Sequence, residues 1–285
     1  MERSRRVKRT RLGFVSLIST TRLAAYTLGR YMAQPKINLS LVLRMKHLIF
    51  ILGLLICTSN VQAQETPDLI TTVLGELDFA KSEVNMGRAT KQEISGMPDK
   101  SIVVIPKIAE TDQKSYMILD AYVLLVDNKT GQIEAKFVDE RAWTSDAYIL
   151  YDIEIQHKPY ILNEETKAFG IILVYESDSR VNRFGERALS LFALSNKSLV
   201  RILKDYPLIS TKSESGGNCN SEYEIRTRNL KVTDTMTNQY NDLKVIDNVE
   251  KGKSTEENCE PHTVTKTQNI EYLKFRNGKY QSVSN

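Results

Sequence analysis

The chain has 285 residues, 41% of them hydrophobic, with 39 basic and 35 acidic residues and a net charge of +4. Residues 1–63 hold 11 basic residues and one acidic residue, so the remaining 222 residues hold 28 and 34, a net charge of −6. A net-acidic domain lacks the clustered Lys and Arg that bind phosphates, and this excludes nucleic acid as an expected partner.

Residues 1–44 form an Arg-rich leader in which Glu2 is the single acid. An acid-poor, Ser-containing leader of this kind is typical of a mitochondrial transit peptide. The pair Arg5-Arg6 also permits a twin-arginine signal, although the apolar residues that usually follow are missing. We favour a third interpretation, in which Met45 is the true start and residues 1–44 lie upstream of it, because a complete signal sequence begins there.

Residues 45–63 have the three parts of a secretory signal peptide: a basic start, the apolar run 48–56 and a small-residue end. The apolar run is too short to cross a bilayer, which takes about 20 helical residues. A buried core helix would show a polar stripe, and the run has none. We predict cleavage between Ala63 and Gln64, and an exported bacterial protein that is periplasmic or extracellular.

Cys57 lies at the end of the apolar run and raises the alternative of a lipoprotein, in which this cysteine is acylated and retained. That processing requires a small residue just before the cysteine, and this chain has Ile56. We therefore predict removal of Cys57 with the signal. The exported domain, residues 64–285, is expected to contain no stable transmembrane helix.

The first element expected after the signal is a short helix. Leu69, Ile70, Val73, Leu74 and Leu77 are spaced for one apolar helix face. Pro67 suits the first turn, whereas Thr71, Thr72 and Gly75 weaken the prediction.

The rest of the domain favours strands, since apolar residues recur with a period of two. A buried run at 102–105 is expected to stop at Pro106. A hairpin is predicted from 116–126 and 133–137 around the turn Asp127–Gly131, and a second from 189–194 and 199–203. Alternation at 148–157 places Ile149, Tyr151, Ile153 and Ile155 on one side, and 169–175 is apolar on both faces. Weaker strands follow at 223–225, 230–232, 243–246 and 270–275, and Asn277-Gly278 predicts a tight turn before 279–281.

The predicted fold class is all-β or β-rich α+β, an antiparallel meander, sandwich or propeller-like sheet with a short N-terminal helix. Residues 213–221, which contain Gly216-Gly217, are expected to form a loop. This loop allows the domain 64–285 to be subdivided near 208–220.

Two cysteines follow the signal, Cys219 and Cys259. An even pair in an exported protein predicts one disulfide. The alternative is that both cysteines and His262 bind zinc, or that a Cys-His pair is catalytic. A fourth zinc ligand is not evident, and we predict neither a metal nor a cofactor.

The sequence contains none of the common nucleophile, zinc-protease, dinucleotide or P-loop motifs. His157 ends an alternating strand, where a surface histidine is the simpler interpretation. Asp152 and Glu154 share a strand face about 7 Å apart, a spacing open to glycosidase chemistry but also expected of a solvated strand.

Two further segments carry weak signals. Residues 176–186 are rich in oxygen ligands for calcium, but Arg180 and Arg183 oppose a cation. Trp143, with Tyr148 and Tyr151 nearby, permits an aromatic binding patch, although one indole in a β domain is more often part of the core.

These observations predict an exported, non-catalytic module that binds a protein, a glycan or an envelope component. The alternative is an exported hydrolase that uses the pair Asp152 and Glu154, or His262. No residue is assigned a catalytic role.

Overall fold

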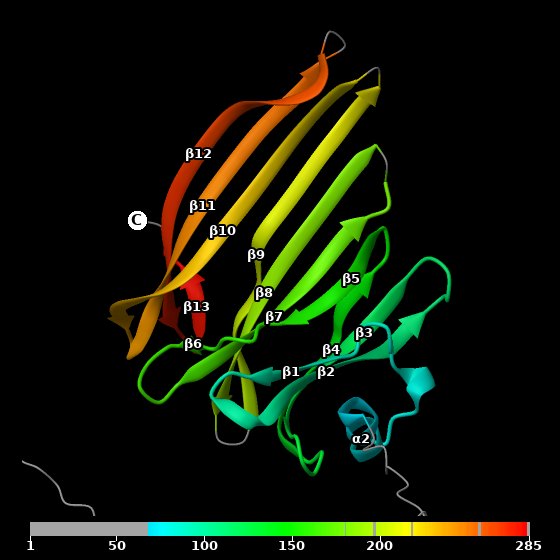
Figure 1. Cartoon of the computed structure of the whole chain (residues 1–285), viewed down its shortest axis with the longest axis vertical. Coiled ribbons are helices and arrows are strands. Elements are labelled where there is room, and N and C mark those ends of the chain that lie inside the picture. Colours follow the sequence, from blue (N-terminus) through cyan, green and yellow to red (C-terminus); the bar gives the residue numbers. More distant parts are fainter. Residues whose placement is uncertain (1–67, 180, 196–197, 218, 256–257, 284–285) are drawn as a thin grey trace, which may run out of the picture. The chain divides into compact units, whose positions relative to one another are not determined.

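The computed structural model describes residues 68–179, 181–195, 198–217, 219–255 and 258–283. Within these residues, 13 strands join in one hydrogen-bonded sheet, accompanied by a single α-helix (Figure 1). The prediction of a β-rich fold is therefore confirmed.

The first part of the sheet is an antiparallel meander of four strands. Their bounds are β1 Thr90–Ile94, β2 Met97–Thr111, β3 Met117–Asp127 and β4 Ile133–Ser145. The first predicted hairpin is β3–β4, whose turn is held by the Asp127 carboxylate as it accepts hydrogen bonds from the amides of Lys129 and Thr130. One parallel bridge, between Lys136 and Ser198, joins β4 to the rest of the sheet.

The second part is a longer antiparallel meander in the order β5, β7, β8, β9, β10, β11, β12, β13, with β6 paired to β7. The bounds are β5 Tyr148–Ile155, β6 Tyr160–Ile161, β7 Lys167–Ser177, β8 Asn182–Ser195, β9 Ser198–Gly217, β10 Asn220–Thr237, β11 Tyr240–Thr255, β12 Asn258–Arg276 and β13 Lys279–Ser282. The second predicted hairpin is β8–β9. Asn277 and Gly278 both have positive φ in the predicted turn before β13.

Side chains at alternate positions along the strands form the central core. Ile102 and Val104 of β2 and Phe169 and Ile171 of β7 point into one apolar cluster between β1–β4 and β5–β9. Because successive side chains of a strand point to opposite faces, each strand also supplies a second cluster. These strands are consequently buried on both sides.

The outer face of β2 and β3 is covered by the predicted helix, α2 Leu69–Glu76, and a short 3₁₀ turn, Lys81–Glu83. Val73 and Leu74 are buried against Val103, Ile105 and Leu124. Asp68 precedes the helix and pairs with Lys91 at 2.5 Å. The helix prediction is confirmed, and Pro67 lies outside the described residues.

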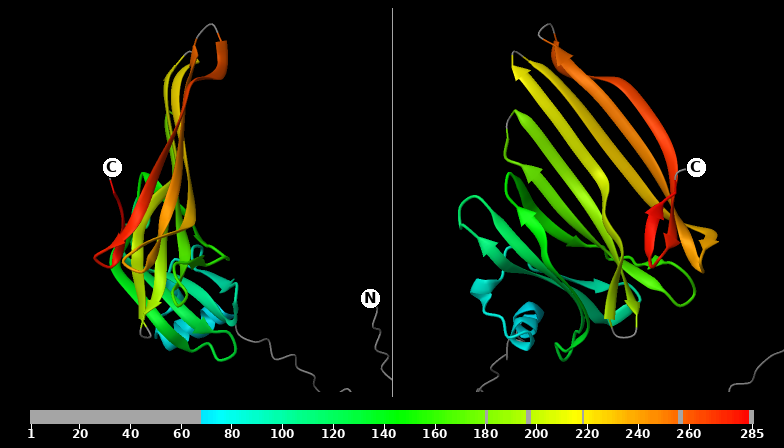
Figure 2. Two further views of the ribbon diagram at one scale, coloured as in Figure 1. Left: turned by 90° about the vertical axis from the view of Figure 1, so that its left-hand side faces the viewer. Right: turned by 180° about the vertical axis from the view of Figure 1, so that it is seen from behind.

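The sheet splits between β9 and β10. Residues Ile209–Gly217 of β9 pair with Asn220–Thr227 of β10, and the pairing ends at Ile209 and Thr227. The lower parts of β7–β9 and of β11–β13 instead face one another across an apolar cluster that includes Leu189, Leu243 and Leu273. Above the split, residues 209–217, 220–229, 246–255 and 258–270 form what we call the upper sheet, which Figure 2 shows as a single layer.

Two boundary predictions are wrong. Pro106 does not end its strand, because β2 runs to Thr111. The neighbouring strand β1 ends opposite Val104, so no ladder bond is required from Pro106 on that side. The expected loop at 213–221 is also wrong, because residues 213–217 belong to β9 and residues 220–221 to β10.

The predicted alternation of β5 is also wrong in part. The register shifts between Leu150 and Asp152, so Leu150 and Ile153 are buried whereas Ile149 and Tyr151 are exposed. A bulge of this kind inserts one residue and reverses the faces that follow it. The alternation in the sequence continues unbroken through this point.

Candidate functional site

The upper sheet carries ionic side chains on one face. The register places Glu224 between Lys212 and Lys251, and Glu222 between Glu214 and Lys253. Three lysines thus face three glutamates, and the group has no net charge. Such balance gives no attraction to phosphate polymers.

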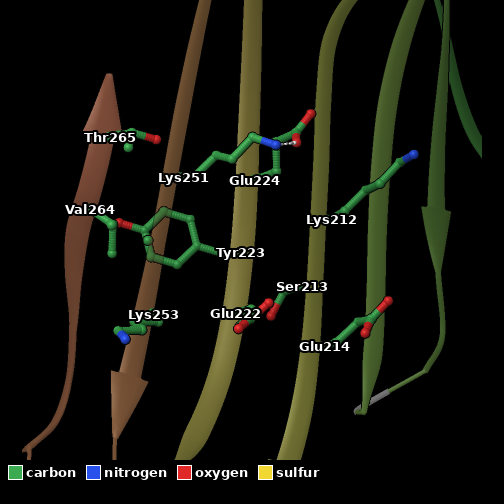
Figure 3. A pocket seen from close by; sticks show the side chains of 11 residues that line it. Lys212, Ser213, Glu214, Glu222, Tyr223, Glu224, Lys251, Lys253, Val264 and Thr265 are labelled. Atoms are coloured by element: carbon green, nitrogen blue, oxygen red, sulfur yellow. Dashed lines mark ion pairs between the residues drawn. The ribbon is translucent and has the colours of Figure 1, made fainter. Parts of the chain in front are cut away.

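The best-defined ion pair of this face joins Lys251 Nζ to Glu224 Oε2 at 2.9 Å (Figure 3). The hydrogen bond from Lys251 holds the pKa of Glu224 below its usual value, and the positive charges of Lys251, Arg226 and Lys212 act in the same direction. Glu224 therefore remains ionised at neutral pH. A carboxylate in this state is a poor general acid.

The opposite face is built around Tyr223, which the register places between Ser213 and Gly252. A Cβ atom on Gly252 would lie 2.3 Å from the Tyr223 hydroxyl oxygen and 2.4 Å from the carbonyl oxygen of His262. Glycine is therefore what allows the ring to lie against β11. Figure 3 shows the ring extending across β11 toward Val264. We call this side the Tyr223 face.

Amide, hydroxyl and apolar groups continue the Tyr223 face below the ring. Thr227, Asn248 and Gln268 lie opposite one another on β10, β11 and β12. The Gln268 amide donates a hydrogen bond to the Asn248 side-chain oxygen at 2.8 Å. Ile225 and Ile270 are exposed on the same face. Glu250 and Lys266, opposite Ile225, form an ion pair at 3.1 Å, so the Tyr223 face combines amides, hydroxyls and apolar side chains with one neutral ion pair.

A shallow recess of about 490 Å³ lies over these strands (Figure 3). Its lining comes from all four strands of the upper sheet and comprises Lys212, Ser213, Glu214, Glu222, Tyr223, Glu224, Lys251, Gly252, Lys253, Val264 and Thr265. The described lining supplies carboxylates, ammonium groups, hydroxyl groups and the Tyr223 ring.

The predicted disulfide joins Cys219 to Cys259 at the tip of the upper sheet, with their Cα atoms 5.0 Å apart. Ser254 of β11 lies between them and donates a hydrogen bond to the Cys219 carbonyl oxygen at 2.5 Å. The bond links the β9–β10 turn to the start of β12. Because both sulfurs are bonded, neither is available to zinc or as a nucleophile, and the Cys-His alternatives are wrong.

A polar cluster closes the split at the base of the upper sheet. Arg228 lies 3.4 Å from the carboxylate of Asp247 and donates a hydrogen bond to the Pro207 carbonyl oxygen at 2.9 Å. Its guanidinium also lies over the Tyr206 ring, whose hydroxyl donates to Glu271. Burial raises the pKa of Tyr206 above its usual value, and the hydrogen bond to Glu271 raises it further. Sequence reasoning missed this cluster because its members lie up to 65 residues apart.

The carboxylate pair expected on β5 does not act as a pair. Both oxygens of Glu154 accept hydrogen bonds from the guanidinium of Arg187, one of them at 2.8 Å. Asp152 is exposed and accepts a hydrogen bond from the amide of Ile153 at 2.8 Å. Because Arg187 holds Glu154, the two carboxylates serve different contacts. The arrangement is that of a solvated strand face.

The two histidines of the described residues lie on different segments. His157 is exposed beyond the end of β5, with its Nδ1 3.0 Å from the Glu93 carbonyl oxygen. Its own carbonyl accepts a hydrogen bond from the amide of Ser95, which fastens β1 to this segment. His262 lies on β12 opposite Lys253. Neither histidine has a nucleophilic side chain among the contacts described for it.

The expected aromatic patch is divided by burial. Trp143 is buried in the central core, whereas Tyr148 and Tyr151 are 51% and 56% exposed. Of residues 176–186, 176–177 end β7 and 182–186 begin β8, and Ser177 Oγ accepts a hydrogen bond from the Phe184 amide at 2.8 Å. Among the described residues, no three His, Cys, Asp or Glu side chains are grouped so that they could hold a metal ion.

The predicted cleavage site at Ala63 and Gln64, and the lipidation candidate Cys57, lie outside the described residues. No helix in the described part of the chain has the length and apolar character needed to span a membrane. Comparison of the chain with protein-family models, curated proteins and solved structures found no match.

Proposed function

We propose that the chain is an exported, non-catalytic binding module whose Tyr223 face holds an uncharged, polar polymer such as a glycan of the cell envelope. The observation that carries this proposal is the upper sheet itself. It extends beyond the apolar clusters as a single layer and presents one aromatic ring among amides, hydroxyls and the Glu250–Lys266 ion pair.

A single-layer sheet gains little from burial of apolar surface, because no second layer covers either face. The upper sheet is instead held by its ladders and by the Cys219–Cys259 bond. Strands of this length are not needed to complete the cores below. This favours a role in contact with another molecule.

Export is supported by the three-part signal pattern at 45–63 and by the disulfide, which is characteristic of oxidising compartments. The choice of an uncharged polymer rests on the charge balance of both faces: three lysines against three glutamates on one face, and the Lys266–Glu250 ion pair on the Tyr223 face. An aromatic ring against exposed amides is suited to the apolar faces and hydroxyl groups of a sugar ring.

The test uses the full chain recovered from the periplasm of a bacterial host. Retention on insoluble peptidoglycan, chitin and cellulose is measured as depletion from solution, together with release of reducing ends. We expect retention on one of these polymers without release of reducing ends. Tyr223→Ala should weaken that retention about ten-fold or more, the loss typical of a central aromatic contact.

The matched control is Tyr151→Ala, which removes an exposed tyrosine outside the upper sheet and should leave retention unchanged. Equal loss in the two variants, or no retention of the unmodified chain on any of the polymers, contradicts the proposal. Release of reducing ends that disappears in Asp152→Asn would instead establish the alternative, an exported hydrolase.

A further inference from the structure

A cavity of about 360 Å³ opens at the end of the central core, beside the β1–β2 and β6–β7 connections, and is also lined by Leu194 of β8 and Leu199 of β9. Its walls are formed by core side chains from five strands: Ile94, Ile102, Leu125, Phe169 and Leu199. All five are buried. The cavity is separate from the upper sheet, and nothing in the proposed function uses it.

The walls define what this cavity can hold. Protein interiors leave few voids larger than a water molecule, and water enters a cavity only where several polar groups can bind it. Aliphatic and aromatic side chains dominate here, and Met97 adds a flexible thioether that adapts to the shape of an occupant. The volume lies within the range of small-molecule pockets, about 300–1,000 Å³. An apolar occupant therefore fits the site.

Among the described residues that line the cavity, the one cation is Lys167. Lys167 shares with Phe169 the face of β7 that points toward the central core, since the two are separated by one residue. Lys167 is exposed, and it forms no ion pair with another described residue. Glu165 lies on the rim before the strand begins, and Leu194 is 48% exposed at the mouth.

We propose that this cavity binds the single unbranched chain of a free medium-chain fatty acid, with the carboxylate at Lys167. Transfer of the apolar chain from solvent into contact with Ile94, Ile102 and Leu199 supplies the affinity. The lysine selects an anionic head group over a neutral one. The site is independent of the Tyr223 face, so failure of either proposal leaves the other intact.

The experiment titrates the full chain with decanoate and with decanol, both at concentrations below micelle formation, and measures affinity and the change in Tm. We expect one decanoate per chain and a raised Tm. Lys167→Gln should weaken decanoate binding about three- to ten-fold, because the head-group contact is partly exposed, and leave decanol binding unchanged. Lys114→Gln, which removes an exposed lysine from the β2–β3 turn, should change neither.

Leu199→Phe places a larger side chain in the cavity and should reduce binding of both ligands at least ten-fold. Met97→Trp fills it from the opposite wall and provides the same measurement if Leu199→Phe unfolds. The absence of decanoate binding, or binding that persists in both filled variants, overturns the proposal. Equal effects of Lys167→Gln on decanoate and decanol overturn the head-group assignment. Association with phosphatidylglycerol vesicles that is unchanged in the filled variants would place the lipid contact on another surface and contradict the cavity as its site.

Discussion

At the scale of the residue, two glycines lie in environments in which the methyl group of an alanine would have opposite effects on stability. Gly252 lies under the Tyr223 ring and close to the backbone of β12, whereas Gly75 in α2 has no described heavy atom within 4 Å of the point that a Cβ atom would occupy. The first position has no room for a side chain. The second exposes a residue of low helix propensity in the last turn of a helix.

Gly252→Ala should therefore destabilise the protein by about 1–3 kcal/mol, the usual effect of overpacking. Gly75→Ala should stabilise it by up to about 1 kcal/mol, because alanine has the higher helix propensity. Urea unfolding of both variants beside the unmodified chain measures the two free energies. Changes of the same sign in the two variants would contradict the proposed difference in packing.

Several residue-scale predictions depended on local chemistry, and these are confirmed. Asp127 in its turn and Asn277-Gly278 before β13 need only their immediate neighbours. The pairing of Cys219 with Cys259 followed from there being two cysteines after the signal. In contrast, Tyr223 against Gly252 and Arg228 beside Asp247 depend on strand register, which no local pattern specifies.

At the scale of the element, the disulfide acts on the tips of two hairpins. It closes a segment with a sequence separation of 40 and crosses β11 near Ser254. The constraint contributes roughly 4 kcal/mol on the chain-entropy model. Since the upper sheet is a single layer, most of its resistance to local opening depends on this bond and the ladders beside it.

The variant with Cys219→Ser and Cys259→Ser should lose amide hydrogen-exchange protection in 209–217, 220–229 and 246–255, at least ten-fold relative to the unmodified chain. The strands β2 and β3, buried between two clusters, should keep theirs. Reduction of the unmodified protein should reproduce the pattern. Uniform loss of protection through β2 and β3 would show that the bond stabilises the whole fold instead.

Sequence patterns located elements well where one or both faces are buried. The runs in β2, β3, β7 and β8 are apolar because they contact core on each side. The long strands β10 to β12 were recognised only as fragments around their few apolar residues, because their upper parts are polar on both faces and show no periodic contrast. The recess over the upper sheet was missed for the same reason.

At the scale of the whole molecule, the layers could not be predicted. Knowing the strands leaves open which of them pair, and the single bridge between β4 and β9 has no signal in the sequence. The fold class followed from composition and period alone. The split between β9 and β10 follows from pairing that stops at Ile209, a property of the assembled sheet.

The organisation of the whole chain also leads to a prediction about processing. Because the signal pattern ends at Ala63, N-terminal sequencing of protein secreted by a bacterial host should begin at Gln64. Mass spectrometry of the same sample should find no acyl group, since cleavage before Gln64 would remove Cys57. A mature chain that retains residues from 1–44 would contradict the assignment of Met45 as the start.

The split sheet has a mechanical consequence. A partner that pulls on the tip loads β9 and β10 along their length, and below the split these two strands pass into different layers. The Cys219–Cys259 bond passes part of the same load to β12. Tension at the tip is therefore shared between the two layers that contain the lower parts of β9 and β10. Because the force runs along the strands, it shears the ladders, and many hydrogen bonds resist it at the same time.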